Sequence, residues 1–117
     1  MHERIWLTIG VLTVSVTGAG AAWAKPPAPS RVAMQDADPN AQNWHFEPGD
    51  VTVKAGTTVV WDNQGAQEHT VSAADNSFDS GPVAPGKNWQ HAFSAPGDFS
   101  YSCKPHPWMK AVIHVTR

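Results

Sequence analysis

Short stretches of alternating apolar and polar residues run along most of the chain, and turn-forming residues separate them. In residues 51–54, two valines alternate with a threonine and a lysine, which is the period-two pattern of a strand with one buried face. Glycine, proline, asparagine or aspartate ends each stretch at intervals of roughly ten residues, as is typical of strands joined by turns. The strands predicted on this basis are residues 51–54, 57–61, 69–72, 89–93, 99–102 and 111–116.

No segment of any length shows the apolar spacing of a helix. Many short strands in one small domain indicate an all-β fold, either an antiparallel β-sandwich or a barrel. A chain of this size buries one modest core. The side chains predicted to form it are Trp44, Phe46, Val59, Trp61, Phe93, Phe99, Tyr101, Val112 and Val115.

The chain of 117 residues is long enough for one domain, which we predict to span residues 44–117. Residues 25–43 begin with a proline-rich stretch and end in a run rich in aspartate, so we interpret them as a linker. The short apolar stretch at residues 32–34 offers an alternative, in which this segment forms a first edge strand.

Residues 1–24 have the pattern of a secretory signal peptide. Arg4 precedes an apolar run from Ile5 to Ala22, and small residues at 22 and 24 fit a cleavage site after Ala24. The alternative is an uncleaved membrane anchor, but threonine, serine and glycine interrupt the run and no basic stop follows it. We therefore expect export to an oxidising compartment such as a bacterial periplasm, with no stable membrane insertion after cleavage.

The charge pattern argues against a nucleic-acid partner, and the single cysteine suggests a chemical role for its thiol. The formal net charge of −2 and the absence of basic runs argue against binding to nucleic acid. Cys103 is the only cysteine. In an exported protein an unpaired cysteine is an intermolecular link, a reactive thiol or a metal ligand.

Three potential soft or borderline metal ligands lie within seven residues of each other, between two predicted strands. Cys103 offers a thiolate, His106 an imidazole and Met109 a thioether. A cysteine and two histidines with a weak axial methionine form the ligand set of blue-copper electron-transfer sites. Alone, Cys103 would be interpreted as a buried small apolar residue and Met109 as a core residue. Together in one loop they favour copper, while zinc sites use cysteine, histidine and carboxylates rather than methionine.

A second histidine must come from another segment, and His69 is the best candidate. It follows a turn at the end of one predicted strand, where it can face a loop at the same end of the opposite sheet. The other histidines are given surface or packing roles, because His45 stands at the beginning of the domain and His91 and His114 lie inside predicted strands.

With these residues in place, the sequence resembles the cupredoxins, the small blue-copper proteins that include plastocyanin, pseudoazurin and amicyanin. The resemblance implies an eight-stranded Greek-key β-sandwich, with copper near one end and His69 as the second histidine ligand. The residues that carry it are Phe46, Pro48, Val51, Val53, Gly56, Val59, Trp61, Asn63, His69, Thr70, Val71, Phe78, Asp79, Ser80, Gly81, Pro85, Gly86, Pro96, Gly97, Phe99, Tyr101, Cys103, His106, Pro107 and Met109.

The ligand loop is most similar to that of amicyanin, since two residues separate each pair of ligands and prolines flank the histidine. The resemblance implies that His106 reaches the surface through an apolar patch, which Pro105, Pro107 and Trp108 would form. Core packing is the alternative for Trp108. Two polar residues, Gln67 and Glu68, precede the first histidine where amicyanin has a methionine and a proline.

The function predicted from the sequence is that of a monomeric, diffusible carrier of single electrons. The partners implied are redox proteins, a cytochrome c above all, with a periplasmic dehydrogenase of the methylamine dehydrogenase type as a second option. The alternatives are a periplasmic copper chaperone or buffer, and a fragment of an enzyme such as a nitrite reductase or a multicopper oxidase. We expect no enzyme activity, because the chain offers neither a second metal site nor a substrate pocket.

Overall fold

The computed structural model describes residue 25 and residues 27–117. The predicted signal peptide and its cleavage site lie outside the described residues, so they stay predictions. Within the part that is described, no helix has the length and apolar character needed to cross a membrane.

The described residues form eight strands and one short 3₁₀ helix. The elements are β1 (Ser30–Gln35), η2 (Ala41–Asn43), β2 (His45–Glu47), β3 (Asp50–Lys54), β4 (Thr57–Asn63), β5 (Ser72–Ala73), β6 (Asn88–Phe93), β7 (Gly97–Ser102) and β8 (Lys110–Thr116). Five of the six predicted strands form, with shifts of one or two residues at their ends. The predicted strand at residues 69–72 does not form as such, because only Ser72 lies in β5 and His69 makes an isolated bridge with Val83.

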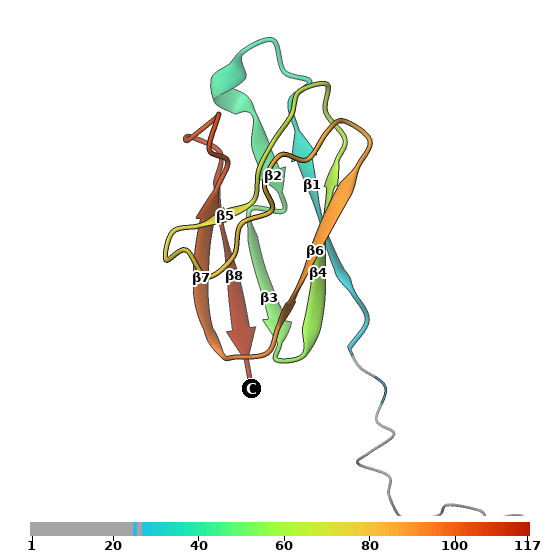
Figure 1. Cartoon of the computed structure of the whole chain (residues 1–117), viewed down its shortest axis with the longest axis vertical. Helices are drawn as coiled ribbons and strands as arrows, with labels where there is room; N and C mark the ends of the chain where they lie inside the picture. The colour runs from blue at the N-terminus through green and yellow to red at the C-terminus, as the bar shows by residue number, and fades with distance from the viewer. Residues whose placement is uncertain (1–24, 26) are drawn as a thin grey trace, which may run out of the picture.

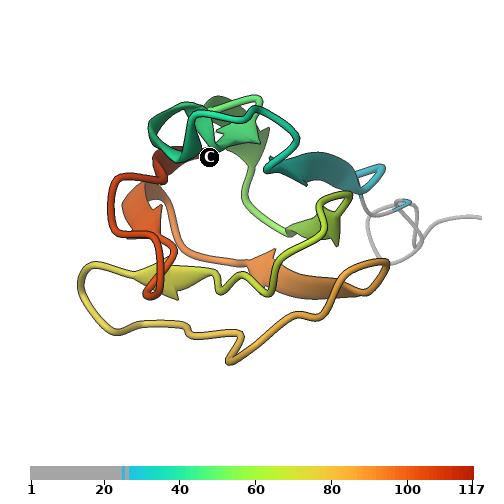
Figure 2. The ribbon, with the colours of Figure 1, turned by 90° about the horizontal axis from the view of Figure 1, so that it is seen from above.

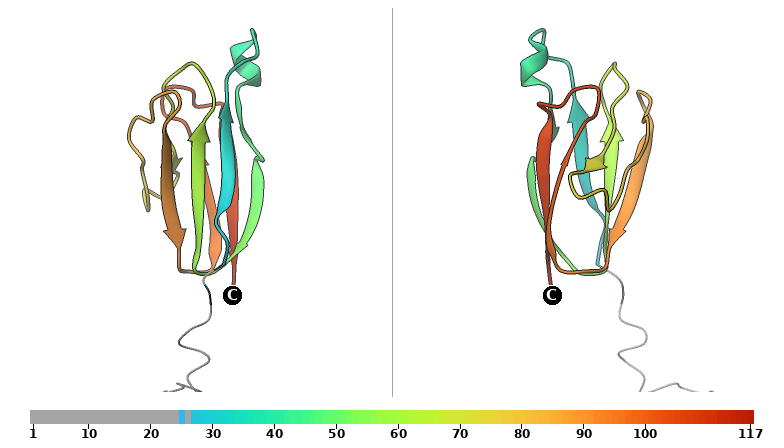
Figure 3. Two further views of the ribbon diagram at one scale, coloured as in Figure 1. Left: turned by 90° about the vertical axis from the view of Figure 1, so that its right-hand side faces the viewer. Right: turned by 60° about the vertical axis from the view of Figure 1, so that its left-hand side comes forward.

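The strands form two four-stranded sheets packed face to face (Figures 1 and 3). One sheet has the order β2-β1-β4-β6 and the other has the order β3-β8-β7-β5. The predicted β-sandwich is confirmed. The sheets are mixed rather than purely antiparallel, because β1 pairs with β4, and β3 with β8, in the parallel sense. Each of these pairs is made by a crossover between the sheets and not by a hairpin.

β1 decides between the two predictions for residues 25–43, because the alternative of a first strand is supported and only its edge position is wrong. It lies between β2 and β4, so it is an interior strand and neither a linker nor an edge strand. Val32 and Met34 are fully buried. The β-sandwich therefore includes residues from Ser30 onward, and not only from residue 44. The proline-rich stretch before residue 30 and the turn residues after residue 35 concealed a strand of only six residues.

Figure 2 shows the ribbon from above. Buried residues of both sheets form one hydrophobic core. Six of the nine predicted members are buried, namely Phe46, Val59, Trp61, Phe93, Tyr101 and Val115. The other three, Trp44, Phe99 and Val112, are only partly buried. Val112 could not share a face with Val115, because side chains alternate along a strand and Ile113 and Val115 take the inward positions of β8.

The loops at one end of the sandwich bring distant segments together (Figure 1). The loop between β7 and β8 lies beside η2, where the indole Nε1 of Trp108 donates a hydrogen bond of 2.7 Å to the carbonyl oxygen of Ala41. The connections that follow β1 and β4 reach the same end. The residues predicted to bind metal all belong to this end.

Candidate metal centre

The loop between β7 and β8 is a compact series of turns. The N–H of His106 donates to the carbonyl oxygen of Cys103 at 3.2 Å, and that of Met109 donates to the carbonyl oxygen of His106 at 2.9 Å. The N–H of Cys103 donates to the carbonyl oxygen of Met109 at 3.1 Å and closes the loop. Pro105 and Pro107 restrict the backbone on both sides of His106. The three predicted ligands of this loop are therefore held by its own backbone.

His69 enters the same end from the segment between β4 and β5. Its backbone pairs with Val83 through two hydrogen bonds, of 3.2 Å from the His69 N–H and 2.8 Å from the Val83 N–H. The side chain is completely buried. The prediction that His69 faces the loop of the opposite sheet is supported by this placement.

Three donor atoms converge on one point. The Sγ atom of Cys103 lies 3.7 Å from Nδ1 of His69 and 3.4 Å from Nδ1 of His106, and the two nitrogens are 3.2 Å apart. A point equidistant from the three atoms lies about 2 Å from each, which matches the bonds from nitrogen and sulfur ligands to a transition-metal ion. These are the only three residues of the described chain in such a cluster. Together with Met109, completely buried at the end of the loop, the donor set fits copper.

Burial controls the protonation of two of these groups. Burial raises the pKa of the Cys103 thiol, and hydrogen bonds from Thr70 and His106 only partly oppose this. Burial also lowers the pKa of His106, with the neighbouring His69 ring acting in the same direction. A neutral imidazole is the form that binds a metal, whereas the thiol must release its proton on binding.

Thr70 joins the two ligand-bearing segments. Its backbone N–H points at Sγ of Cys103 at 3.4 Å, and its hydroxyl oxygen accepts a hydrogen bond of 2.9 Å from the N–H of Lys104. Asn63 joins the connection that follows β4 to the one that follows β5, since its side-chain amide donates to the carbonyl oxygens of Gln67 and Val83. Both residues thus stiffen the surroundings of His69 and Cys103.

Asp36 is a residue of the site that the sequence analysis missed. One of its carboxylate oxygens lies 2.8 Å from Nε2 of His69, on the side of the ring opposite the donor cluster. Burial acts to raise the pKa of Asp36, but hydrogen bonds from Ala66, Gln67 and His69 together hold it below its ordinary value. A signal was present, because Asp36 directly follows β1 and continues the alternation of the buried Val32 and Met34, so its side chain lies on the same side as theirs.

The residues predicted to form a docking patch lie at the surface around His106. Pro105 and Pro107 are exposed, and Trp108 is 37% exposed, the one large apolar side chain of the described residues that is classed as exposed. His106 packs edge-on between Trp44 and Trp108, with ring centroids 5.1 and 5.5 Å away. The core-packing alternative for Trp108 is therefore wrong, since it rests on η2 at the surface.

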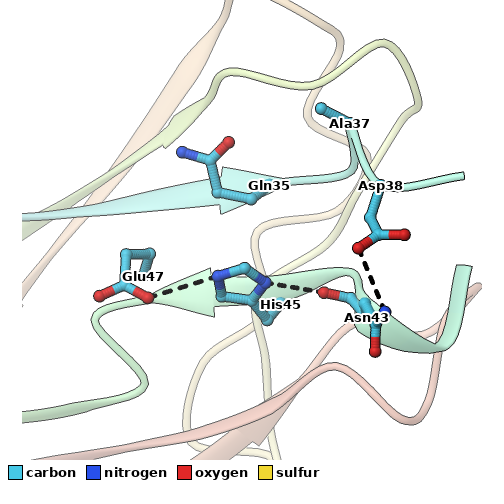
Figure 4. A pocket seen from close by; sticks show the side chains of 6 residues that line it. All are labelled: Gln35, Ala37, Asp38, Asn43, His45 and Glu47. Atoms are coloured by element: carbon cyan, nitrogen blue, oxygen red, sulfur yellow. Dashed lines mark hydrogen bonds and ion pairs between the residues drawn. The ribbon is translucent and has the colours of Figure 1, made fainter. Parts of the chain in front are cut away.

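A separate hollow of about 280 Å³ opens near η2, lined by Gln35, Ala37, Asp38, Asn43, His45 and Glu47. In it, Nε2 of His45 faces the carboxylate of Glu47 at 3.3 Å, while Nδ1 lies 2.8 Å from the carbonyl oxygen of Asn43 (Figure 4). None of the three clustered donors lines this hollow. It is thus independent of the candidate metal centre.

Sequence comparisons identify a family with the same chemistry. The profile of the family described as copper-binding proteins of the plastocyanin/azurin type matches residues 33–116. Amicyanin-alpha of Methylorubrum extorquens is 34% identical over 80 residues, covering 60% of this chain and 63% of that protein. Plastocyanin of Scenedesmus fuscus is 34% identical over 83 residues, covering 60% and 85%. Amicyanin of Paracoccus versutus is 26% identical and covers 92% of both chains.

Solved structures agree on the fold. A purple cupredoxin from Nitrosopumilus maritimus superimposes with a TM-score of 0.68 at 24% identity, covering 74% of this chain and 99% of that one. An oxidised amicyanin variant gives a TM-score of 0.65 at 22% identity, covering 74% and 81%. A copper-containing nitrite reductase from Thermus scotoductus gives 0.67 at 24% identity, but only 26% of its chain is covered. The similarity is therefore limited to the part of that enzyme, about a quarter of its chain, that has this fold.

Proposed function

The chain belongs to the plastocyanin/azurin family of copper-binding proteins, and we propose that it is an exported carrier of single electrons. In this proposal His69, Cys103, His106 and Met109 hold one copper ion, which supplies the change between Cu(I) and Cu(II). The convergence of the Cys103 sulfur and two imidazole nitrogens on one point is the observation that carries the proposal.

The protein matrix supports electron transfer because it restrains the donor atoms. Cys103, Met109 and His69 are completely buried, and backbone hydrogen bonds fix both segments that bear them. A site that moves little between oxidation states has a small reorganisation cost. The same burial opposes easy release of the ion, and so favours a carrier over a copper chaperone or buffer.

His106 provides the route to the surface, since it is the least buried of the three clustered ligands. Pro105, Pro107 and Trp108 form the apolar patch around it that would contact a partner. A small patch of this kind suits weak encounters that dissociate quickly. We propose a cytochrome c as the generic partner, with a dehydrogenase of the methylamine dehydrogenase type as an alternative. The exposed Gln67 and Glu68, which precede His69, would help to determine which redox partner binds.

The pattern of residues 1–24 supports export to the periplasm, where the mature protein would act as a diffusible monomer. The match to 26% of a nitrite reductase does not carry that enzyme's activity over, because the described residues hold one cluster of metal-binding type. The protein is therefore proposed to pass electrons between redox partners rather than to act on a small-molecule substrate.

Stopped-flow kinetics with a reduced cytochrome c, combined with metal analysis, tests this proposal. We expect fast, reversible reduction of the copper-loaded protein, with the copper still bound after repeated cycles. The copper-treated Cys103→Ser variant serves as the matched control and is expected to show no exchange. Ready transfer of copper to an apo-acceptor, with slow electron exchange, would instead favour the chaperone.

A further inference from the structure

We propose that Asp36 is a positioning residue of the metal centre, which orients His69 and favours the higher oxidation state of the bound metal. Its carboxylate would hold the His69 ring in the tautomer whose free nitrogen faces Cys103 and His106. This inference rests on the proposed function, and the experiment below separates a failure of one from a failure of the other.

The carboxylate of Asp36 is buried and closely surrounded by the turn that follows β4. Its side chain is only 2% exposed, and its two oxygens accept backbone hydrogen bonds of 2.8 Å from the N–H groups of Ala66 and Gln67. At Gly65 a β-carbon would lie 2.2 Å from the nearer carboxylate oxygen. The turn after β4 therefore has room for this carboxylate only because residue 65 has no side chain.

The contact between Asp36 and His69 determines which ring nitrogen carries the proton. Nε2 of His69 lies 2.8 Å from a carboxylate oxygen, which accepts and cannot donate when ionised. The proton therefore resides on Nε2, and Nδ1 presents its lone pair. Nδ1 is the atom that lies 3.7 Å from Sγ of Cys103 and 3.2 Å from Nδ1 of His106.

The charge of Asp36 has a second consequence. Within the described chain its only ion-pair partner is the His69 ring, which is neutral when it binds a metal. A buried negative charge next to a ligand stabilises Cu(II) more than Cu(I), because the divalent ion carries the larger charge. Removal of a carboxylate that supports a metal-binding histidine typically costs about 10–100-fold in metal affinity.

The test compares Asp36→Asn with Asp98→Asn. The second variant makes the same chemical change near the start of β7, whereas Cys103 follows the other end of this strand. The Asp98 side chain is exposed. We expect Asp36→Asn to weaken Cu(II) binding about tenfold more than Cu(I) binding, which raises the reduction potential by about 59 mV for one electron. Asp98→Asn is expected to keep the potential of the wild type. An unchanged potential in Asp36→Asn, with the visible spectrum retained, would contradict the proposed charge effect.

A measurement on the metal-free wild-type protein does not depend on whether any variant folds. Nitrogen NMR at about pH 8, where a free histidine is neutral, reports the tautomer of His69. We expect the proton on Nε2, and a proton on Nδ1 would overturn the positioning role. If copper fails to produce a thiolate absorption band in the wild type, the proposed function is wrong, whereas the tautomer still tests Asp36 separately.

Discussion

The tight contact between Gly65 and Asp36 makes Gly65→Ala an informative perturbation. The new methyl group would lie 2.2–2.5 Å from three atoms of the carboxyl group, far inside the roughly 3.5 Å at which non-bonded atoms attract each other. The carboxyl group cannot simply rotate away, because Ala66, Gln67 and His69 all hold it. The turn or β1 must therefore shift.

The expected cost has two parts. Overpacking in a buried region costs about 1–3 kcal/mol. The loss of one hydrogen bond to a charged group adds about 1.5–3 kcal/mol. We therefore expect Gly65→Ala to lower the free energy of unfolding by about 3 kcal/mol, which corresponds to a melting temperature lower by more than about 10 °C for a domain of this size.

Thermal and urea unfolding of the metal-free protein measure this effect, and Gly49→Ala is the matched control. At Gly49 the nearest atom to a β-carbon is the carbonyl oxygen of Phe46 at 3.5 Å, an ordinary contact. Neither glycine has a positive φ, so the comparison isolates the steric conflict. Similar stabilities of the two variants would refute the proposed packing of Gly65 against Asp36.

Three further changes probe other parts of the molecule. The pKa of His114 is raised, chiefly by its hydrogen bond to Asp98, so the stabilisation is complete below the ordinary value of 6.5 and is lost as pH rises through the raised value. Melting temperatures measured upward from about pH 6 should therefore fall more in the wild type than in His114→Gln, and parallel curves would contradict this. Thr70→Val leaves the N–H of Lys104 without its acceptor and should cost about 1–3 kcal/mol in urea unfolding, so an unchanged midpoint would count against the link between the segments. Trp108→Ala should slow electron exchange with cytochrome c about tenfold, as expected for an aromatic contact residue, while the visible spectrum stays the same. An unchanged rate would place docking elsewhere.

The sequence was most informative where chemistry and spacing coincided. Cys103, His106 and Met109 lie in one short loop between two well-patterned strands, so their proximity followed from the chain itself. His69 was predicted from its place after a strand end and from the family resemblance, because three strands separate it from that loop along the chain. The structure brings its Nδ1 atom to the other two donors.

The first strand was predicted only as an alternative, and as an edge strand, while the role of Asp36 just after it was not predicted. β1 is short and its flanking segments are rich in turn-forming residues, so its pattern is weak. Its pairing with β4 is parallel and non-local, which no local pattern indicates. Asp36 was therefore placed in a linker, although its alternation with Val32 and Met34 matches the buried face.

Trp44 shows a second limit of the sequence. It was predicted in the core, but it lies beside the candidate metal centre, with its ring edge-on to both His69 and His106. Its indole Nε1 donates a hydrogen bond of 2.8 Å to the carbonyl oxygen of Asp38, so the segment around η2 folds against it. An aromatic residue signals burial, but the choice of its neighbours depends on tertiary packing.

The visible absorption spectrum of the copper-loaded protein tests the central claim most directly. If Cys103 binds copper as a thiolate together with His69 and His106, the oxidised wild type should absorb strongly near the red end of the spectrum and lose this band on reduction. Copper-treated Cys103→Ser should lack the band altogether. A colourless copper-loaded wild type, or a band that survives in Cys103→Ser, would contradict the account.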